Sequence, residues 1–154
     1  MLKRIQAVAV LIFLFFGFVV TKPTFAQQST AYQINRAHTG FIGFSTALSF
    51  PLTQLWSVSL PDSLSYPVIA EGRVFVLSRS INGDYGTILY ALDAQSGSIL
   101  WRKRIPGTYY WAAHTYGDNR LYVLNYNGRL RAFDPLTGSL LWSRQMPGQY
   151  AFSA

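Results

Sequence analysis

Short apolar runs alternate with turns along most of the chain, in the pattern of β-strands. Eight runs rich in Val, Ile, Leu and aromatic residues are separated by turns that contain Gly, Asn, Asp or Ser. No segment after residue 26 shows a sustained helical period of apolar residues. The pattern therefore predicts an all-β protein. The predicted strands are residues 66–70, 73–79, 87–93, 98–105, 110–116, 120–126, 129–134 and 139–145.

These strands fall into copies of one repeating unit. Residues 89–101 read LYALDAQSGSILW and residues 130–142 read LRAFDPLTGSLLW, with seven of thirteen positions identical. Trp56, Trp101 and Trp142 lie 45 and 41 residues apart, so an earlier copy ends near Trp56. This period, with four short antiparallel strands in each copy, is typical of a propeller blade. Residues 55–154 are therefore expected to form about two β-propeller blades and the start of a third, which is an incomplete propeller.

One hairpin turn within the second copy is predicted in detail. Asn127 and Gly128 separate two predicted strands. This pair readily takes the positive φ angles of a two-residue type I′ turn. We therefore expect a tight type I′ hairpin at this position.

The recurrent Asp, Gly and Trp residues have a structural interpretation. An Asp at the end of a strand can accept hydrogen bonds from backbone amides two residues on. The Gly four residues later suits a positive φ, and the large Trp ring suits the seam between adjacent blades, with its N–H bonded to a carbonyl. A Trp platform for a ligand is the alternative. The structural repeat set comprises Trp56, Ala91, Asp93, Gly97, Trp101, Ala132, Asp134, Thr137, Gly138 and Trp142.

The same residues carry a resemblance to a known family. The spacings Ala91-x-Asp93-x-x-Ser96-Gly97-x-x-x-Trp101 and Ala132-x-Asp134-x-x-Thr137-Gly138-x-x-x-Trp142 resemble the tryptophan-docking repeat of pyrroloquinoline-quinone (PQQ)-like β-propellers. The resemblance covers about residues 55–154 and implies that each Trp docks against the next blade. It extends both to quinoprotein dehydrogenases, whose propellers bind PQQ and calcium, and to BamB-like scaffold proteins of the outer-membrane assembly machinery, which bind no cofactor.

The residues that would indicate a dehydrogenase are mostly absent from the sequence. The resemblance implies an adjacent cysteine pair and Asp, Glu and Asn calcium ligands for such an enzyme, whereas this chain has no Cys and a single Glu, Glu71. We therefore predict a non-catalytic binding or scaffold module with no catalytic, cofactor-binding or metal residues. The alternative is the N-terminal part of a PQQ-dependent dehydrogenase, in which other blades would supply the ligands for PQQ and calcium.

Two clusters remain as candidates for binding. Tyr109, Tyr110, Trp111 and His114 are interpreted as core or seam packing, with a ligand platform as the alternative. The cluster Arg102-Lys103-Arg104 is interpreted as a solvated outer strand whose charges discourage edge pairing. An anionic surface, such as lipid headgroups or acidic glycans, is the alternative partner for this cluster.

The N-terminus has the pattern of an export signal. Lys3 and Arg4 precede the apolar run 7–20, and Thr24-Phe25-Ala26 suits cleavage after residue 26. An uncleaved anchor is the alternative. We expect a periplasmic, cell-surface or secreted protein without a transmembrane span after the signal. The sequence contains 13 basic and 6 acidic residues, and removal of the three basic residues in positions 1–26 leaves ten against six, or +4, which does not indicate a nucleic-acid partner.

Residues 27–54 precede the first repeat and do not belong to it. We expect an extended arm that supplies a strand to complete a blade, with an unstructured leader as the alternative. A propeller needs four to eight blades, so the chain is expected to be the N-terminal portion of a longer protein or a truncated reading frame. If 154 residues were the whole protein, closure would require self-association. The expected partners are proteins or other components of the cell envelope.

Overall fold

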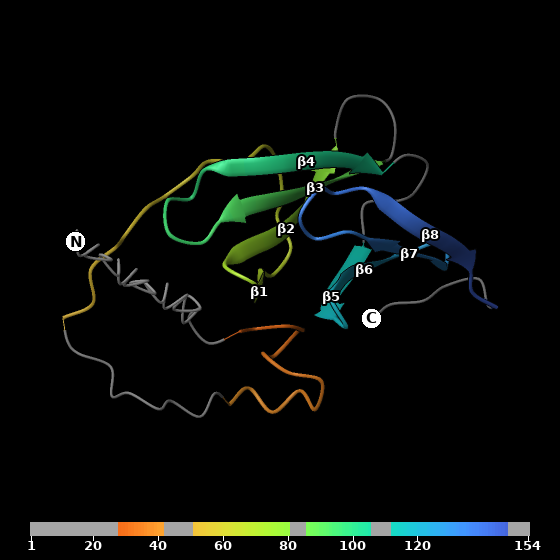
Figure 1. The fold of residues 1–154 in the computed structure, drawn as a ribbon, viewed down its shortest axis with the longest axis horizontal. Helices are drawn as coiled ribbons and strands as arrows, with labels where there is room; N and C mark the ends of the chain where they lie inside the picture. The colour runs from red at the N-terminus through yellow and green to blue at the C-terminus, as the bar shows by residue number, and fades with distance from the viewer. Residues whose placement is uncertain (1–27, 42–50, 81–85, 106–111, 148–154) are drawn as a thin grey trace, which may run out of the picture.

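The computed structural model describes residues 28–41, 51–80, 86–105 and 112–147. These residues form two four-stranded antiparallel sheets, each with its strands in sequence order (Figure 1). This arrangement confirms the all-β prediction of four strands in each repeat, and the sheets do not form a closed ring. The first sheet consists of β1 (Val68–Ala70), β2 (Arg73–Ser80), β3 (Gly86–Asp93) and β4 (Ile99–Ile105), and the second of β5 (Ala112–Gly117), β6 (Arg120–Asn125), β7 (Arg129–Phe133) and β8 (Leu140–Gln145). Within the described ranges there is no helix whose length and apolarity would let it cross a membrane.

The hairpin turns explain where the strands end. The β1–β2 turn places Glu71 and Gly72 at φ values of 50° and 68°, and the β5–β6 turn places Asp118 and Asn119 at 48° and 55°. Paired positive φ values are those of type I′ turns, whose twist matches that of the flanking strands. Each of these hairpins therefore has a loop of only two residues.

The predicted type I′ turn at Asn127 and Gly128 is wrong. Gly128 has a φ of 76°, but Asn127 does not have a positive φ. The amide of Gly128 donates to the carbonyl oxygen of Asn125 at 2.9 Å, and the amide of Arg129 donates to Oδ1 of Asn127 at 3.1 Å. β6 ends one residue earlier than predicted, so the loop has three residues. A three-residue loop typically combines a type I turn with one left-handed residue, and Gly128 takes that position.

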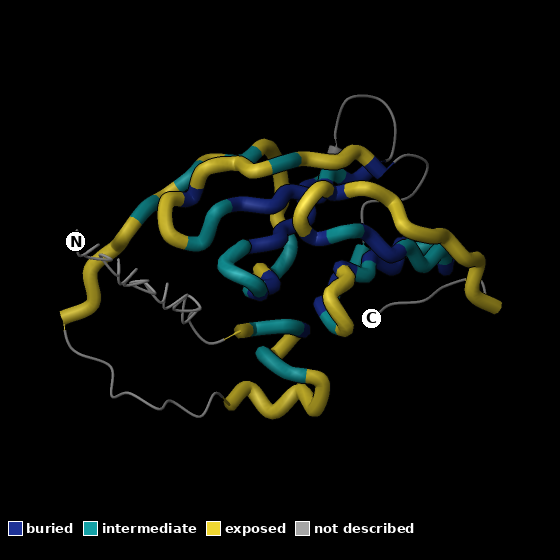
Figure 2. Tube along the Cα trace, viewed as in Figure 1, coloured by how far each residue is buried: buried dark blue, intermediate teal, exposed yellow. Residues whose placement is uncertain are grey.

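The main core lies between the two sheets. Each strand alternates its side chains between two faces, and one apolar face of each sheet is turned toward the other. The buried set in this seam is Val68, Ala70, Phe75, Leu77, Leu89, Ala91 and Ile105 of the first sheet with Tyr116, Leu121, Val123 and Phe133 of the second. Figure 2 shows the buried strands at the centre and the exposed outer strands around them.

The opposite face of the first sheet is covered by a segment that precedes β1. Val74, Val76, Tyr90 and Leu92 form this second buried cluster. Trp56, Val58 and Leu60 pack against it, at alternate positions of an extended chain. This segment aligns with β4 and β8 in the repeat, so it occupies the place of an outermost strand next to the first sheet.

Residues 28–41 of the arm lie at the edge where the sheets meet. The two sheets approach each other most closely at β1 and β5. Ser29 pairs antiparallel with Ile69 of β1, through amide-to-carbonyl hydrogen bonds of 2.8 and 2.7 Å. The carbonyl oxygen of Thr30 accepts from the amide of Tyr116 in β5 at 2.8 Å. The arm (orange in Figure 1) therefore joins the inner strands of both sheets.

Candidate functional site

The Asp turns at the ends of β3 and β7 have the same hydrogen-bond pattern. In the first sheet the amides of Gln95 and Ser96 donate to Oδ1 of Asp93 at 3.0 and 2.7 Å, and the Ser96 hydroxyl donates to the same oxygen at 2.9 Å. These bonds, of which the Ser96 amide contributes most, lower the pKa of Asp93 below its ordinary value. The carboxylate is therefore used to hold the turn.

The second sheet repeats this turn. The amides of Leu136 and Thr137 each donate to Oδ1 of Asp134 at 2.8 Å, and the Thr137 hydroxyl donates to it at 3.1 Å. The Thr137 amide is the main cause that lowers the pKa of Asp134. Ser96 and Thr137 are thus equivalent because both supply a hydroxyl donor at the same place.

Each Asp turn ends at a glycine that lies under a Trp ring from the preceding copy. Gly97 has a φ of 72°, and a Cβ atom there would lie 2.6 Å from Cε3 of Trp56. Gly138 has a φ of 68°, and a Cβ atom there would lie 2.7 Å from Cε3 of Trp101. Any side chain at these positions would therefore collide with the ring as well as strain the backbone.

The same two rings are held at their edges by one hydrogen bond each. Nε1 of Trp56 donates to the carbonyl oxygen of Ala94 at 3.0 Å, and Nε1 of Trp101 donates to that of Pro135 at 3.1 Å. Both acceptors directly follow the turn Asp. Trp56 thus docks on the turn of the first sheet, and Trp101 of the first sheet docks on the turn of the second.

The repeat alanines lie opposite a Trp in the sheet register. Ala91 pairs with Trp101, and Ala132 pairs with Trp142. Both alanines are fully buried. A small residue at this position leaves room for the adjacent indole ring on the same face of the sheet.

Trp142 is placed differently from the two docked rings. It is 39% exposed, and its ring lies 5.9 Å from that of Tyr122, much as Trp101 lies 6.0 Å from Phe75. Within the described residues no glycine turn covers Trp142, and no hydrogen bond from its Nε1 is found. Among the described residues, the face of the second sheet that points away from the first is therefore open at Trp142, whereas the corresponding face of the first sheet is covered by the second sheet.

The earliest copy has no docking glycine. The residue four positions before each Trp is Gly97 or Gly138 in the two sheets but Leu52 in the first copy. Leu52 is 64% exposed. Both docking glycines of the described chain are already occupied, by Trp56 and Trp101. The expected self-association of the chain stays a prediction. The Trp rings of a second copy would find no vacant docking glycine among the described residues.

His114, the described member of the aromatic candidate cluster, lies inside the seam. Its side chain has no exposed surface, and its Nε2 donates to the carbonyl oxygen of Phe75 in the other sheet at 3.1 Å. The imidazole stacks on Tyr66 with the ring centres 4.9 Å apart. Burial lowers the pKa of His114 from 6.5 to about 4, so the ring is neutral near pH 7. His114 is therefore packed between the sheets and is not accessible to a ligand.

The other three members of that cluster are not part of the described structure. Tyr109, Tyr110 and Trp111 lie outside the described residues. Their sequence-based interpretation, packing with a ligand platform as the alternative, stays a prediction.

The sequence did not indicate the partner of His114. The hydroxyl of Tyr66 donates to the carbonyl oxygen of His114 at 2.8 Å, although the two residues are 48 positions apart.

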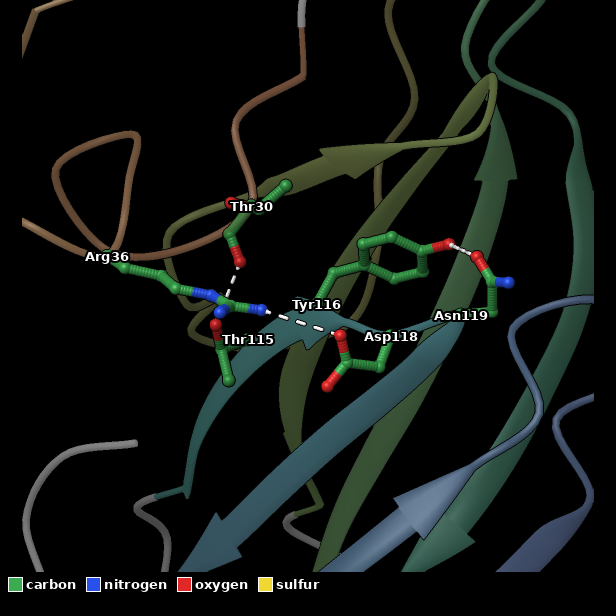
Figure 3. A network of polar contacts seen from close by, with 6 residues as sticks. All are labelled: Thr30, Arg36, Thr115, Tyr116, Asp118 and Asn119. Atoms are coloured by element: carbon green, nitrogen blue, oxygen red, sulfur yellow. Dashed lines mark hydrogen bonds and ion pairs between the residues drawn. The ribbon is translucent and has the colours of Figure 1, made fainter.

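A second candidate site lies between the arm and the β5–β6 hairpin. Figure 3 shows the polar contacts there: the Thr115 hydroxyl donates to the carbonyl oxygen of Thr30 at 2.9 Å, and the Arg36 guanidinium lies 3.9 Å from Asp118. Next to them is a cavity of about 380 Å³, lined in part by Arg36, His38, Asp118 and Tyr122. Arg36 and Asp118 are both largely exposed, so this ion pair contributes little to stability.

The described residues do not form a calcium site of the kind that the resemblance to quinoprotein dehydrogenases includes. Within the described ranges no group of three or more His, Cys, Asp or Glu side chains could hold a metal ion. Calcium requires six to eight oxygen ligands, usually with several carboxylates. Asp93 and Asp134 direct their carboxylates at backbone amides of their own turns, so they do not supply such a set.

Several solved structures are similar to this chain. BamB from Moraxella catarrhalis is 26% identical, with 59% of this chain and 26% of that chain covered and a TM-score of 0.48. A europium-containing methanol dehydrogenase is 19% identical over 82% of this chain and 23% of its own, with a TM-score of 0.56. A quinohemoprotein alcohol dehydrogenase from Comamonas testosteroni is 18% identical over 77% of this chain and 19% of its own, with a TM-score of 0.57. The chain thus spans about a fifth to a quarter of these proteins, and the two dehydrogenases show a shared fold.

The family comparison is more specific than the structural one. No curated protein matches the chain. The model of the family described as outer membrane protein assembly factor BamB matches residues 52–154, which is more than half of the chain. This range contains both Asp turns and all three repeat Trp residues. The chain therefore belongs to this family of PQQ-like β-propeller repeats.

Proposed function

We propose that the chain is an exported, non-catalytic scaffold or binding module of the cell envelope, built from PQQ-like propeller blades. The observation that carries this proposal is the position of the arm. Ser29 and Thr30 are hydrogen-bonded through their backbones to β1 and β5, the strands at which the two sheets meet. The arm thus covers the inner edge of both blades.

Covering this edge favours large partners over an enclosed cofactor. Propeller blades radiate from a central channel, so the strands that lie closest together are the ones nearest to it. Small ligands bind in concave sites that bury most of their surface. With the inner edge covered, the accessible surfaces of the described blades are the outer strands β4 and β8, the open face at Trp142 and the outward side of the arm.

The family and the Asp turns support the same proposal. The matching family is described as an outer membrane assembly factor, and we extend to this chain the expectation of protein partners at that membrane. Asp93 and Asp134, the carboxylates that recur in every complete repeat, hold turns in both sheets. They therefore act in the architecture and are not free for acid–base chemistry.

Titration with PQQ tests the non-catalytic part of the proposal. The full chain is titrated calorimetrically with PQQ, with and without calcium, beside the variant Ser29→Pro, which removes the amide that donates to Ile69. We expect no saturable binding by the unaltered chain. Binding by Ser29→Pro alone would show that the arm covers a PQQ site and would count against a non-catalytic module. Calcium-dependent binding by the unaltered chain would contradict the proposal and favour the N-terminal part of a PQQ-dependent dehydrogenase.

Cross-linking in intact cells tests the scaffold part. Phe41 projects from the arm and is 72% exposed, so a photoreactive phenylalanine analogue at this position should form one discrete adduct with an envelope protein. The same analogue at Gln95, in the exposed Asp turn of the first sheet, is the control. Equal adduct patterns from both positions, or none from position 41, would count against the arm as a contact surface.

A further inference from the structure

The outer edges of both sheets carry an arrangement that the scaffold proposal does not explain. β4 and β8 are the last strands of their sheets, and nearly all of their side chains are exposed. In each strand two adjacent large apolar residues precede the Trp, and three basic residues follow it in β4 and one in β8. The exposed apolar residues of this outer rim are Ile99 and Leu100 of β4 with Leu140 and Leu141 of β8, all between 47% and 49% exposed, and Leu136 of the adjoining turn at 59%.

The basic residues of the outer rim follow in the same strands. Arg102, Lys103 and Arg104 are exposed on β4, and Arg144 is exposed on β8. Neither strand contains an acidic residue. The nearest acidic groups in the sequence are Asp93 and Asp134, whose carboxylates accept hydrogen bonds within their own turns. Because side chains alternate along a strand, Arg102 and Arg104 lie on one face of β4 and Lys103 on the other. As the edge of the sheet, the outer rim therefore presents apolar and cationic side chains from both faces.

The outer edge of the first sheet contacts the turn before β8 through the docked Trp101. Its Nε1 donates to the carbonyl oxygen of Pro135, the residue before Leu136, and its ring covers Gly138, two residues before β8. Trp101, which follows the apolar pair of β4, thus contacts the turn that contains Leu136 and leads into β8. Figure 2 shows that both outer strands are exposed over most of their length.

We propose that this outer rim binds an anionic lipid surface. Half-exposed Leu and Ile side chains can enter the boundary between headgroups and acyl chains, while neighbouring Arg and Lys side chains pair with lipid phosphates. An acidic glycan would leave the apolar residues without a partner. The +4 charge after residue 26 has the sign needed for attraction to such a surface. This inference goes beyond the scaffold proposal and does not depend on it.

Edge protection is the competing explanation of the basic residues. Charged side chains on an outer strand discourage pairing with another sheet. That explanation accounts for Lys103 and its neighbours but not for the exposed Leu and Ile residues in the same strands. It also predicts a different result, because removing the charges should then cause self-association and leave lipid binding unchanged.

Vesicle flotation with the full chain tests the charges. Vesicles of phosphatidylcholine alone are compared with vesicles of equal parts of phosphatidylcholine and phosphatidylglycerol, so that any contribution of the N-terminal apolar run is measured on the neutral vesicles. At about 1 kcal/mol for each basic residue at an anionic surface, Arg102→Gln with Lys103→Gln should lower partitioning onto anionic vesicles by about 10- to 30-fold. The control, Arg36→Gln with Arg120→Gln, removes the same charge from exposed positions outside the outer rim. It should change partitioning onto anionic vesicles by less than about twofold.

A second pair of variants tests the apolar half. Leu100→Ser with Leu141→Ser should weaken binding to anionic vesicles without changing its dependence on salt, whereas Leu52→Ser with Leu55→Ser should have little effect. Equal losses for the two charge variants, no preference for phosphatidylglycerol, or new self-association with unchanged vesicle binding would each overturn the proposal. Retained binding to an acidic polysaccharide with none to vesicles would also overturn it.

Discussion

Replacing Gly138 by Ala should destabilise the protein more than a left-handed glycine position alone would explain. The φ of 68° at Gly138 costs an Ala about 1 to 2 kcal/mol. The new Cβ would also lie 2.7 Å from Cε3 and 2.9 Å from Cδ2 of Trp101, where carbon atoms normally approach to about 3.5–4.0 Å. The ring cannot retreat freely because Nε1 is bonded to Pro135, and such overpacking adds about 1 to 3 kcal/mol.

The expected loss for Gly138→Ala is therefore about 2 to 5 kcal/mol in the free energy of unfolding, measured by urea denaturation followed by circular dichroism. Gly40→Ala is the matched control, because Gly40 has a φ of 64° but no heavy atom within 4 Å of the added Cβ. A second control places Gly138→Ala in a Trp101→Leu background, where only the backbone cost should remain. A loss that is the same in both backgrounds, or no larger than that of Gly40→Ala, would refute the docked ring as the cause.

Two further predictions follow from the seam and from the open face. Because burial lowers the pKa of His114 to about 4 from 6.5, the unfolded chain takes up this proton at a higher pH than the folded chain. The free energy of unfolding should therefore fall by roughly 3 kcal/mol between pH 6.5 and 4, and the fall should be reduced in His114→Gln; an unchanged pH profile would place the imidazole in solvent. Trp101→Ala should lower the free energy of unfolding by about 3 to 5 kcal/mol, and Trp142→Ala by less than half as much, because the Trp142 ring is 39% exposed. Equal losses in urea denaturation would show that Trp142 is docked as well.

The strands could be predicted from the sequence because each strand and turn has a local signal. Every predicted strand boundary lies within two residues of the observed one. The turn at Asn127 was wrong because Asn-Gly pairs also occur in three-residue loops, and the choice depends on where β6 ends. That end is set by Asn125, whose fully buried side chain accepts from Arg131 in the next strand, a contact that local composition does not reveal.

The candidate sites were less predictable because their contacts span long distances in the sequence. Repetition pointed to the seam for Trp101, since an equally spaced residue has the same architectural role in each copy. No repeat includes the arm, so its pairing with β1 and β5 had no comparable signal. The stacking of His114 on Tyr66 likewise requires the two sheets to be packed together. The sequence does show Leu52 where the other two copies have a glycine four residues before the Trp. That this copy therefore lacks a docking position is evident only once the Trp56 ring is seen to cover Gly97.

The arm's hydrogen bonds have a consequence for the order in which the chain folds. Strands within each sheet pair with their neighbours along the chain, whereas Thr30 bonds to a residue 85 positions later. Contacts between distant residues form late, because the loop between them must be closed first. The arm is synthesised before either sheet, yet its binding site on β5 does not exist until residue 116 has been added. Docking of the arm should therefore be the last step, and its amides should be among the first to exchange with solvent when the native state opens locally.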